Sequence, residues 1–237
     1  MNDAGNLDDI FIILDLDRTL LDTEAFQHVY EQVIRERHSD VIEAMSYARD
    51  EVERGGGSFD THEYMQRCVT PQQLREFDDA LAERLRQSPE SVMNPGSLTL
   101  LEQLRQLNVH HGVLTYGNDT WQTLKMRASG LETMPYLVTQ DNRKGHVLRS
   151  WQADSGAFHL PTALTAQEMG GHTIYSSIVL LDDKAVSFQD LPMNAKGYWY
   201  RPSDNLLKSQ VGDVPAHVQT IRHLDEFLPA LRRDFVA

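Results

Sequence analysis

The sequence has only one cysteine, few basic residues and no long apolar run. Cys68 stands alone, so no intramolecular disulfide can form, and a metal cluster held by several thiolates is excluded. The first apolar run, Ile10 to Leu14, is too short for a membrane span, and Asp8 and Asp9 precede it where a secretory signal carries positive charge. We therefore expect a cytoplasmic protein without a membrane partner.

Positive charge is scarce along the whole chain. Against 35 acidic residues there are 22 basic ones, which gives a formal net charge of −13. Such a field repels polyanions, so we expect no nucleic-acid partner. An acidic protein still binds a small phosphate ester where a divalent cation and a local lysine reverse the charge. The charge balance therefore favours a metal without identifying it.

What the sequence does contain is a series of short apolar runs separated by helical patterns. With 41% hydrophobic residues over 237 positions, the chain fits one ordinary domain plus a smaller insertion. Parallel strands are buried on both faces, so continuous apolar runs predict an α/β fold, a Rossmann-like parallel sheet flanked by helices. The runs that predict strands are Ile10–Leu14, Gly112–Leu114, Tyr136–Val138, Ile178–Leu181 and Tyr198–Tyr200.

Between the first two runs, a stretch from about Thr23 to Met93 has no convincing strand pattern and is predicted to be wholly helical. Thr70 and Pro71 form a plausible cap and first-turn pair for its last helix. Two apolar stripes at helical spacing support this interpretation: Phe26, Val29, Tyr30, Val33 and Ile34, and then Leu74, Phe77, Leu81 and Leu85. The simplest division is a core of residues 1–22 and 94–237 with an inserted helical cap of residues 23–93.

Two turns bear on how this cap would work. Gly55-Gly56-Gly57-Ser58 separates its two halves, and it is either a segment that reaches the substrate or a plain connector. Pro95-Gly96 marks the return to the core, where Ser97 is expected to cap a helix through Leu107. Because both connections lie near the predicted chemistry, we expect the cap to act as a mobile lid.

Carboxylates follow two of the predicted strands. Asp15 and Asp17 leave the first one, and residues two apart in extended backbone project to the same side. Asp182 and Asp183 follow the fourth run, and ligands of open α/β sheets bind at such carboxyl ends. Adjacent buried carboxylates need a counter-charge, most naturally Mg²⁺ in an oxygen-rich site. Alone, the first pair could equally be a chance acidic turn.

Two further features add a phosphate-binding character to this edge of the sheet. Thr115 ends the second run and precedes Tyr116-Gly117, where a hydroxyl and backbone amides could hold a phosphoryl oxygen. Lys144 follows the third run, where a point cation could balance a nucleophile and a phosphate. Each is commonplace alone, because a threonine before a glycine turn is common and a loop lysine is usually solvated.

Together and in this order, these features resemble the four motifs of the haloacid dehalogenase superfamily. The motifs are the Asp15–Thr19 segment (DLDRT), the threonine at position 115, the downstream Lys144, and the acidic pair at positions 182 and 183. Pro95-Gly96-Ser97-Leu98 also resembles the superfamily's approach to strand two. The helical insertion stands where the superfamily's type 1 cap stands. The resemblance therefore implies a hydrolase of phosphoric monoesters that depends on Mg²⁺.

The resemblance also implies roles for individual residues. Asp15 would be the nucleophile that is transiently phosphorylated, and Asp17 would serve as general acid and then as general base. Thr115, Tyr116, Gly117 and Lys144 would bind the phosphate of a small phosphorylated metabolite. Mg²⁺ would be held by Asp15, the carbonyl of Asp17 and Asp182, with Asp183 supporting the ligand shell.

The sequence departs from the superfamily's pattern at two positions and leaves two other functions open. Arg18 stands where relatives often have glycine, and Tyr116 stands where asparagine is common. Members that remove halogen lack the second aspartate, so Asp17 favours phosphate chemistry. The alternatives are a phosphomutase or phosphotransferase with the same core residues, and a non-catalytic binding protein on this scaffold. The particular ester and the oligomeric state cannot be derived from these residues.

Overall fold

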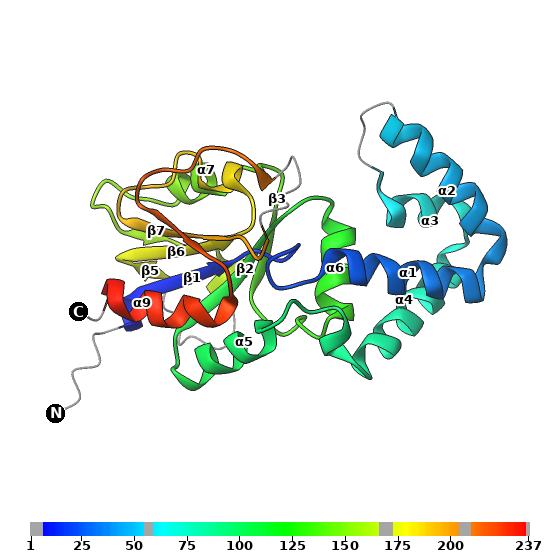
Figure 1. Ribbon diagram of the computed structural model, residues 1–237, viewed down its shortest axis with the longest axis horizontal. Helices are drawn as coiled ribbons and strands as arrows, with labels where there is room; N and C mark the ends of the chain where they lie inside the picture. Colours follow the sequence, from blue (N-terminus) through cyan, green and yellow to red (C-terminus); the bar gives the residue numbers. More distant parts are fainter. Residues whose placement is uncertain (1–6, 55–58, 166–172, 204–209, 236–237) are drawn as a thin grey trace. The chain divides into compact units, whose positions relative to one another are not determined.

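The structure is a computed structural model that describes residues 7–54, 59–165, 173–203 and 210–235 (Figure 1). The chain divides into two compact units, one of residues 1–21, 93–118 and 133–237, and one of residues 22–92 and 119–132. We call the first the core unit and the second the helical unit. The predicted Gly55-Gly56-Gly57-Ser58 turn lies outside the described residues.

The core unit is built on a six-stranded parallel sheet with strand order β3-β2-β1-β6-β7-β8. Its strands are β1 (Ile10–Leu14), β2 (His110–Tyr116), β3 (Tyr136–Thr139), β6 (Ser177–Asp182), β7 (Ala195–Tyr200) and β8 (Val218–Ile221). All five predicted runs lie in these strands, which confirms the predicted parallel α/β sheet. Only β8 was not expected, because its Val-Gln-Thr-Ile sequence is half polar and lies at the sheet edge.

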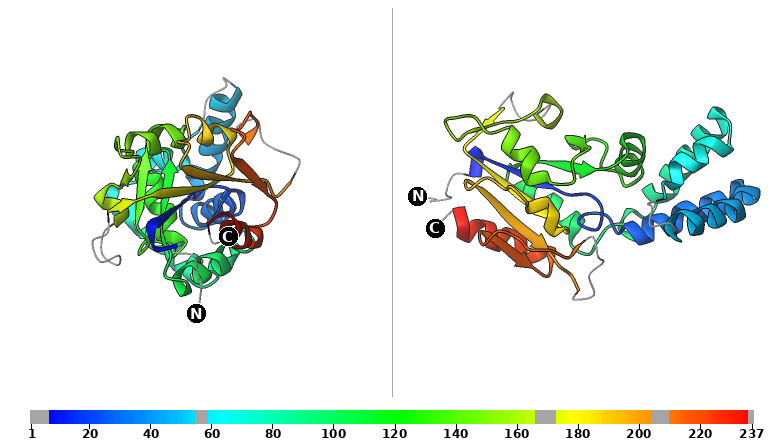
Figure 2. Two further views of the ribbon diagram at one scale, coloured as in Figure 1. Left: turned by 90° about the vertical axis from the view of Figure 1, so that its left-hand side faces the viewer. Right: turned by 90° about the horizontal axis from the view of Figure 1, so that it is seen from above.

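Helices and short turns cover the sheet of the core unit. α5 and α9 lie on one face, and α7 and η3 lie on the other (Figures 1 and 2). The elements of this unit are η1 (Leu7–Asp9), α5 (Ser97–Gln106), α7 (Lys144–Ser150), α8 (Thr162–Thr165), η3 (Ala185–Phe188), η5 (Leu224–Glu226) and α9 (Phe227–Phe235). A separate antiparallel pair joins β4 (Phe158–His159) to β5 (Ile174–Tyr175).

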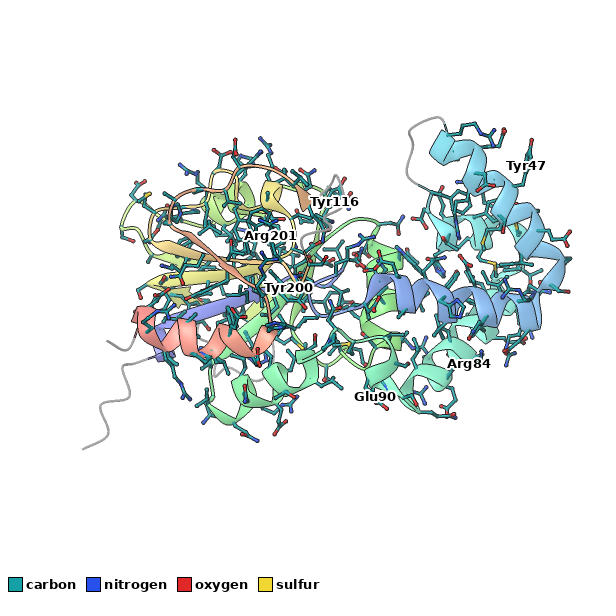
Figure 3. The ribbon with its side chains drawn as sticks, in the orientation of Figure 1. Tyr47, Arg84, Glu90, Tyr116, Tyr200 and Arg201 are labelled. Atoms are coloured by element: carbon teal, nitrogen blue, oxygen red, sulfur yellow. The ribbon has the colours of Figure 1, made fainter. Side chains whose placement is uncertain are left out.

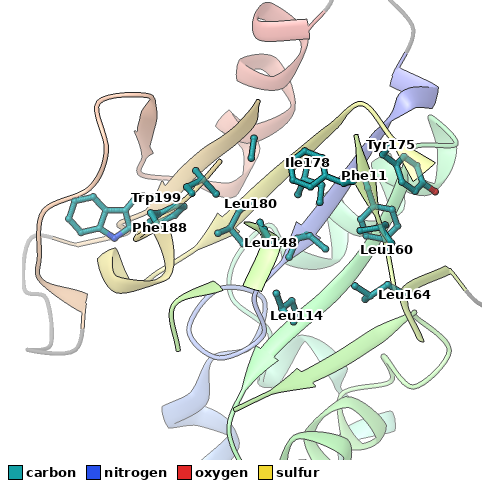
Figure 4. Packing of buried hydrophobic residues seen from close by; sticks show 14 of the residues in the cluster. Phe11, Leu114, Leu148, Leu160, Leu164, Tyr175, Ile178, Leu180, Phe188 and Trp199 are labelled. Carbon is teal, nitrogen blue, oxygen red and sulfur yellow. The ribbon is translucent and has the colours of Figure 1, made fainter. Parts of the chain in front are cut away.

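One large cluster of the apolar core lies on the face covered by α7 and η3. Alternate residues of each central strand point to it, as the period of two in a strand requires. The cluster joins Phe11 and Ile13 of β1, Ile178 and Leu180 of β6, and Ala195 and Trp199 of β7 with Leu148 of α7 and Phe188 of η3 (Figure 4). The residues that follow these strands on the same face therefore lie next to closely packed side chains, which hold the strand ends in place.

The start of α5 differs from the prediction. Gly96, with φ of 87°, occupies the cap position, and Ser97 is the first residue of the helix. The Ser97 hydroxyl donates instead to the carbonyl of Leu20 at 2.8 Å, so the predicted serine cap is wrong. Glycine accommodates this left-handed backbone without a side-chain penalty, which explains the shift by one residue. This hydrogen bond connects the start of α5 to the segment that follows β1.

The helical unit contains α-helices and one 3-10 turn in the part that the structure describes. These are α1 (Thr23–Arg37), α2 (Ser39–Arg54), α3 (Thr61–Cys68), α4 (Pro71–Arg86), η2 (Pro89–Ser91) and α6 (Asp119–Ala128). The predicted start of α4 is confirmed, because the Thr70 hydroxyl accepts from the Gln73 amide and Pro71 is the first helical residue. No helix of the described ranges is long and apolar enough to cross a membrane.

Aromatic packing assigns α6 to the helical unit, although it follows β2 in the chain. Trp121 of α6 lies 5.0 Å from Tyr30 and 5.6 Å from Phe26, between ring centroids. Tyr30 in turn contacts Phe77 of α4 at 4.8 Å. The sequence division placed residues 119–132 in the core, whereas this cluster groups them with the inserted helices. The assignment of the insertion as a cap stays a prediction.

Candidate active site

Three carboxylates meet where β1 and β6 end. Leu14 pairs with Leu181 in these neighbouring parallel strands, so the residues that follow lie side by side. The backbone amide of Asp15 continues the ladder and donates to the carbonyl of Leu181 at 2.9 Å. Carboxylate oxygens of Asp15, Asp182 and Asp183 lie within 4.8 Å of one another, and all three residues are buried. The acidic residues of the two strands thus form one cluster.

Lys144 reaches this cluster from the first turn of α7. Its ammonium contacts Asp15 Oδ1 and lies 2.6 Å from Asp182 Oδ2. Gly145 allows this approach, because a Cβ there would lie 2.7 Å from the backbone nitrogen of Leu191. A larger residue would force α7 away from the segment after η3 and withdraw the lysine. The structure therefore brings together Lys144 and the two strand-end motifs, although Lys144 and Asp15 are 129 residues apart.

The cluster carries more negative charge than Lys144 can balance. Burial raises the pKa of Asp15 to about 6, with Asp182 adding to the rise and Lys144 opposing it. Burial, together with the charges of Asp15 and Asp182, raises the pKa of Asp183 to about 8. Burial alone would lower the pKa of Lys144, but Asp15 and Asp182 hold it above its usual value. A divalent cation among these oxygens would relieve the repulsion.

Asp183 is held by two residues that the sequence analysis did not select for the site. Gln210 Nε2 donates to Asp183 Oδ2 at 2.7 Å, and the Trp199 indole donates to the Asp183 carbonyl at 2.9 Å. Asp183 Oδ1 is buried and has no hydrogen-bond partner in the described part of the chain. Gln210 lies between β7 and β8, outside the predicted strands and helices, so no periodicity or motif could have indicated it. Trp199 lies inside the predicted strand Tyr198–Tyr200, and the apolar run gave no sign of its contact with Asp183.

The turn after β1 positions Asp15 and separates Asp17 from the cluster. Thr19, fully buried, donates its hydroxyl to Asp15 Oδ2 at 3.0 Å. Arg18 has φ of 64°, a left-handed conformation that glycine adopts without strain. Asp17 pairs with Leu21 through a β-bridge and is 9% exposed, and its carboxylate is not part of the three-carboxylate group.

Only part of the predicted phosphate-binding turn after β2 is available to bind a ligand. Thr115 Oγ1 is buried and finds no hydrogen-bond partner among the described residues, so it could hold a ligand oxygen. The Gly117 amide, by contrast, donates to the Thr139 carbonyl at 3.2 Å, and Gln140 Nε2 donates to the Gly117 carbonyl at 2.8 Å. Tyr116, labelled in Figure 3, is 42% exposed at the end of β2. The hydroxyl is therefore a better candidate than the glycine amide.

A cavity of the core unit lies away from these residues. It has a volume of about 680 Å³ and lies between α5 and the η5–α9 segment, with Leu100, Leu107 and Leu228 in its wall. None of the clustered carboxylates lines it. The chemistry of the side chains, and not the size of a hollow, identifies the candidate site.

Comparisons with known proteins agree with this geometry. Residues 12–147 match the family model of the haloacid dehalogenase-like hydrolases. A protein assigned to these hydrolases from Burkholderia xenovorans LB400 has a similar structure, with a TM-score of 0.57, 19% identity, and coverage of 97% of this chain and 99% of that one. The HAD-hydrolase YfnB from Bacillus subtilis, solved with bound magnesium, has a TM-score of 0.52 and 14% identity over 93% of this chain and 97% of its own. No curated protein matched in sequence.

Proposed function

This chain belongs to the haloacid dehalogenase-like hydrolase family, and we propose that it is a magnesium-dependent phosphatase that acts on a small phosphate monoester. The observation that carries the proposal is the buried Asp15 carboxylate, which Thr19 and Lys144 hold beside Asp182. An aspartate fixed from both oxygens next to a permanent cation is prepared to accept an anionic substrate. We further propose that the protein is cytoplasmic and binds no nucleic acid.

The donor set fits a hard divalent cation. It consists of carboxylate oxygens only, and Asp183 Oδ1 is buried with no partner that the described residues supply. Such oxygen-rich sites favour Mg²⁺. Asp15, Asp182 and Asp183 would hold it, with the Asp17 carbonyl as a further ligand implied by the family. When bound, the ion would offset the charge of the nucleophile and of the phosphoryl group. YfnB, the relative from Bacillus subtilis, was solved with magnesium.

The proposed reaction proceeds in two displacements. A carboxylate oxygen of Asp15 attacks phosphorus, and the bond to the alcohol oxygen breaks as Asp17 gives that oxygen a proton. Asp17, now ionised, takes a proton from water, whose oxygen attacks the phosphorus and releases inorganic phosphate and the Asp15 carboxylate. Lys144 and the free hydroxyl of Thr115 would hold the phosphoryl oxygens throughout.

Turnover of p-nitrophenyl phosphate tests the proposal. We expect steady release of inorganic phosphate that stops with a chelator and returns with excess Mg²⁺. A phosphomutase would instead need a sugar bisphosphate activator, and a binding protein would bind Mg²⁺ without turning over any ester. A panel of nucleotides, sugar phosphates and phosphoglycolate would then rank the substrates. Failure of every ester on that panel, with Mg²⁺ bound, would contradict the phosphatase proposal.

A further inference from the structure

The two oxygens of the Asp183 carboxylate differ in their surroundings. Oδ2 accepts from Gln210 at 2.7 Å, while Oδ1 is buried and has no hydrogen-bond partner from the described ranges, and a carboxylate oxygen of Asp183 lies within 4.8 Å of carboxylate oxygens of Asp15 and Asp182. The Asp183 carbonyl is also fixed, at 2.9 Å from the Trp199 indole nitrogen. Both donors come from β7 or from the segment after it. These contacts engage Oδ2 and the carbonyl of Asp183 and leave Oδ1 as the oxygen available to a further ligand.

We propose that Gln210 is a positioning residue that presents Asp183 Oδ1 to the metal ion. The inference rests on the proposed function, because it assumes that the cluster binds a divalent cation. A hydrogen bond to one carboxylate oxygen fixes the rotation of the group, and such outer contacts orient metal ligands. Gln210 is only 7% exposed, so its amide does not exchange this contact for bulk water.

The chemistry of an amide suits this position better than that of a cation. A lysine or arginine at position 210 would form a stronger contact, but its charge would compete with the metal ion for the same carboxylate. An aliphatic side chain would leave Oδ2 buried without a donor, and such a group costs free energy. Glutamine supplies one neutral donor and leaves the negative charge of the cluster intact. Gln210 thus orients the Asp183 carboxylate without weakening the attraction of the acidic cluster for the metal ion.

The core unit provides a matched control for this contact. Gln219 Nε2 donates to Asp234 Oδ2, also at 2.7 Å, and Asp234 further binds Tyr198 and Lys196. This second amide–carboxylate bond involves none of the clustered aspartates. Gln219 Oε1 also accepts from Arg233 at 3.2 Å, so a leucine at this position shows what the loss of both amide contacts, away from the cluster, does to folding and to metal binding.

Metal binding measured on the full chain tests the inference. Calorimetry with Mg²⁺, and spin-resonance titration with Mn²⁺, would be carried out on the wild type, Gln210→Leu and Gln219→Leu. We expect Gln210→Leu to raise the metal Kd about 10- to 100-fold, which is the usual effect of removing an outer-shell contact. Gln219→Leu should leave the Kd within about twofold while lowering the melting temperature. Turnover by Gln210→Leu should recover when Mg²⁺ is raised to saturation.

Each outcome bears on the inference separately from the proposed function. An unchanged metal Kd in folded Gln210→Leu would overturn the inference, because the residue would then be structural only. If Gln210→Leu does not fold, Gln210→Asn replaces it, since its shorter amide cannot span the same distance, and the same rise in Kd is expected. No metal binding by the wild type would overturn both proposals. Metal binding by the wild type without turnover of any ester would overturn the phosphatase proposal alone.

Discussion

The core unit and the helical unit treat their buried polar groups in opposite ways. In the core unit, Asp15, Asp182 and Asp183 lie together although they repel one another. In the helical unit, His62 is buried, but it pairs with the Tyr30 hydroxyl at 3.0 Å and stacks on Trp121. Lys125 of the same unit lies over the Trp121 ring, 5.1 Å from its centroid. The first arrangement costs stability, whereas the second provides His62 and Lys125 with a partner each.

This difference separates function from folding. Like charges are gathered in a buried place only where something else compensates them, and a bound cation with an anionic substrate does so. Among its described residues, the helical unit has no comparable group of buried like charges. Its buried histidine and lysine contact aromatic rings instead. We therefore expect substitutions in the acidic cluster to affect turnover first, and substitutions in the aromatic cluster to affect stability first.

The largest expected effect comes from Asp15→Asn. The amide has nearly the same shape but is not nucleophilic, so phosphate release should fall by more than about a thousandfold. The melting temperature should stay the same or rise, because one repelling charge is removed from the cluster. Phosphate release and thermal unfolding measured on the same preparation provide the check. Activity above about a thousandth of wild type, with contaminating phosphatase excluded, would contradict the nucleophile assignment.

A smaller loss of turnover is expected for Asp17→Asn. General acid–base catalysis contributes about 10²- to 10⁴-fold, so hydrolysis of an alkyl phosphate should slow by that amount. p-Nitrophenyl phosphate should be affected less in the first step, because nitrophenolate leaves without a proton. The ratio of the two losses is the measurement. Full activity of the variant on an alkyl phosphate would show that Asp17 is not the acid.

Stability should dominate in the aromatic cluster. Phe77 is fully buried against Tyr30, and Phe77→Ala should cost about 3 to 5 kcal/mol of unfolding free energy. Phe188→Ala is the matched variant in the core unit, where η3 packs against the helix that carries Lys144. At a temperature where both fold, only Phe188→Ala should also slow p-nitrophenyl phosphate turnover strongly. If both variants slowed turnover equally, the expected separation of function in the core unit from stability in the helical unit would be wrong.

The parts of the fold and of the candidate site that depend on the strand pattern could be predicted from the sequence. The continuous apolar runs located β1 and β6, and the carboxylates of Asp15, Asp182 and Asp183 meet because these two strands are neighbours in register. Lys144 was expected from its place after β3, and the structure brings it to Asp15. The roles of these residues and the lid function of the cap stay predictions.

Contacts between irregular segments could not be predicted. Gln210 reaches Asp183 from a segment without periodicity, and its partner depends on how the chain returns after β7. The Gly117 amide is already engaged, because it donates to the Thr139 carbonyl at the end of the neighbouring strand β3. Trp121 joins the helical unit because its ring packs on Tyr30, although α6 follows a core strand. In each case tertiary packing, and not local pattern, determines the partner.

The smallest expected effect concerns Asp78, an acidic group of the helical unit that resembles those of the core cluster. Burial raises its pKa from 3.8 to about 6, with Arg127 opposing the rise and Asp79 adding to it, and its Oδ1 lacks a hydrogen-bond partner among the residues described. The folded state therefore holds this proton more tightly than the unfolded chain, so stability is lost as the pH rises from about 4 to about 6.

Asp78→Asn should remove this pH dependence without affecting chemistry. At pH 8 the variant should be more stable than wild type by about 1 to 2 kcal/mol, after allowance for solvent screening of a half-buried group. Below pH 4 the two proteins should be equally stable, because the aspartate is then protonated in both states. Denaturant unfolding at the two pH values measures the difference. An equal gain at both pH values would mean that the amide forms a new contact, whereas a large loss of turnover would mean that the helical unit also holds functional charge.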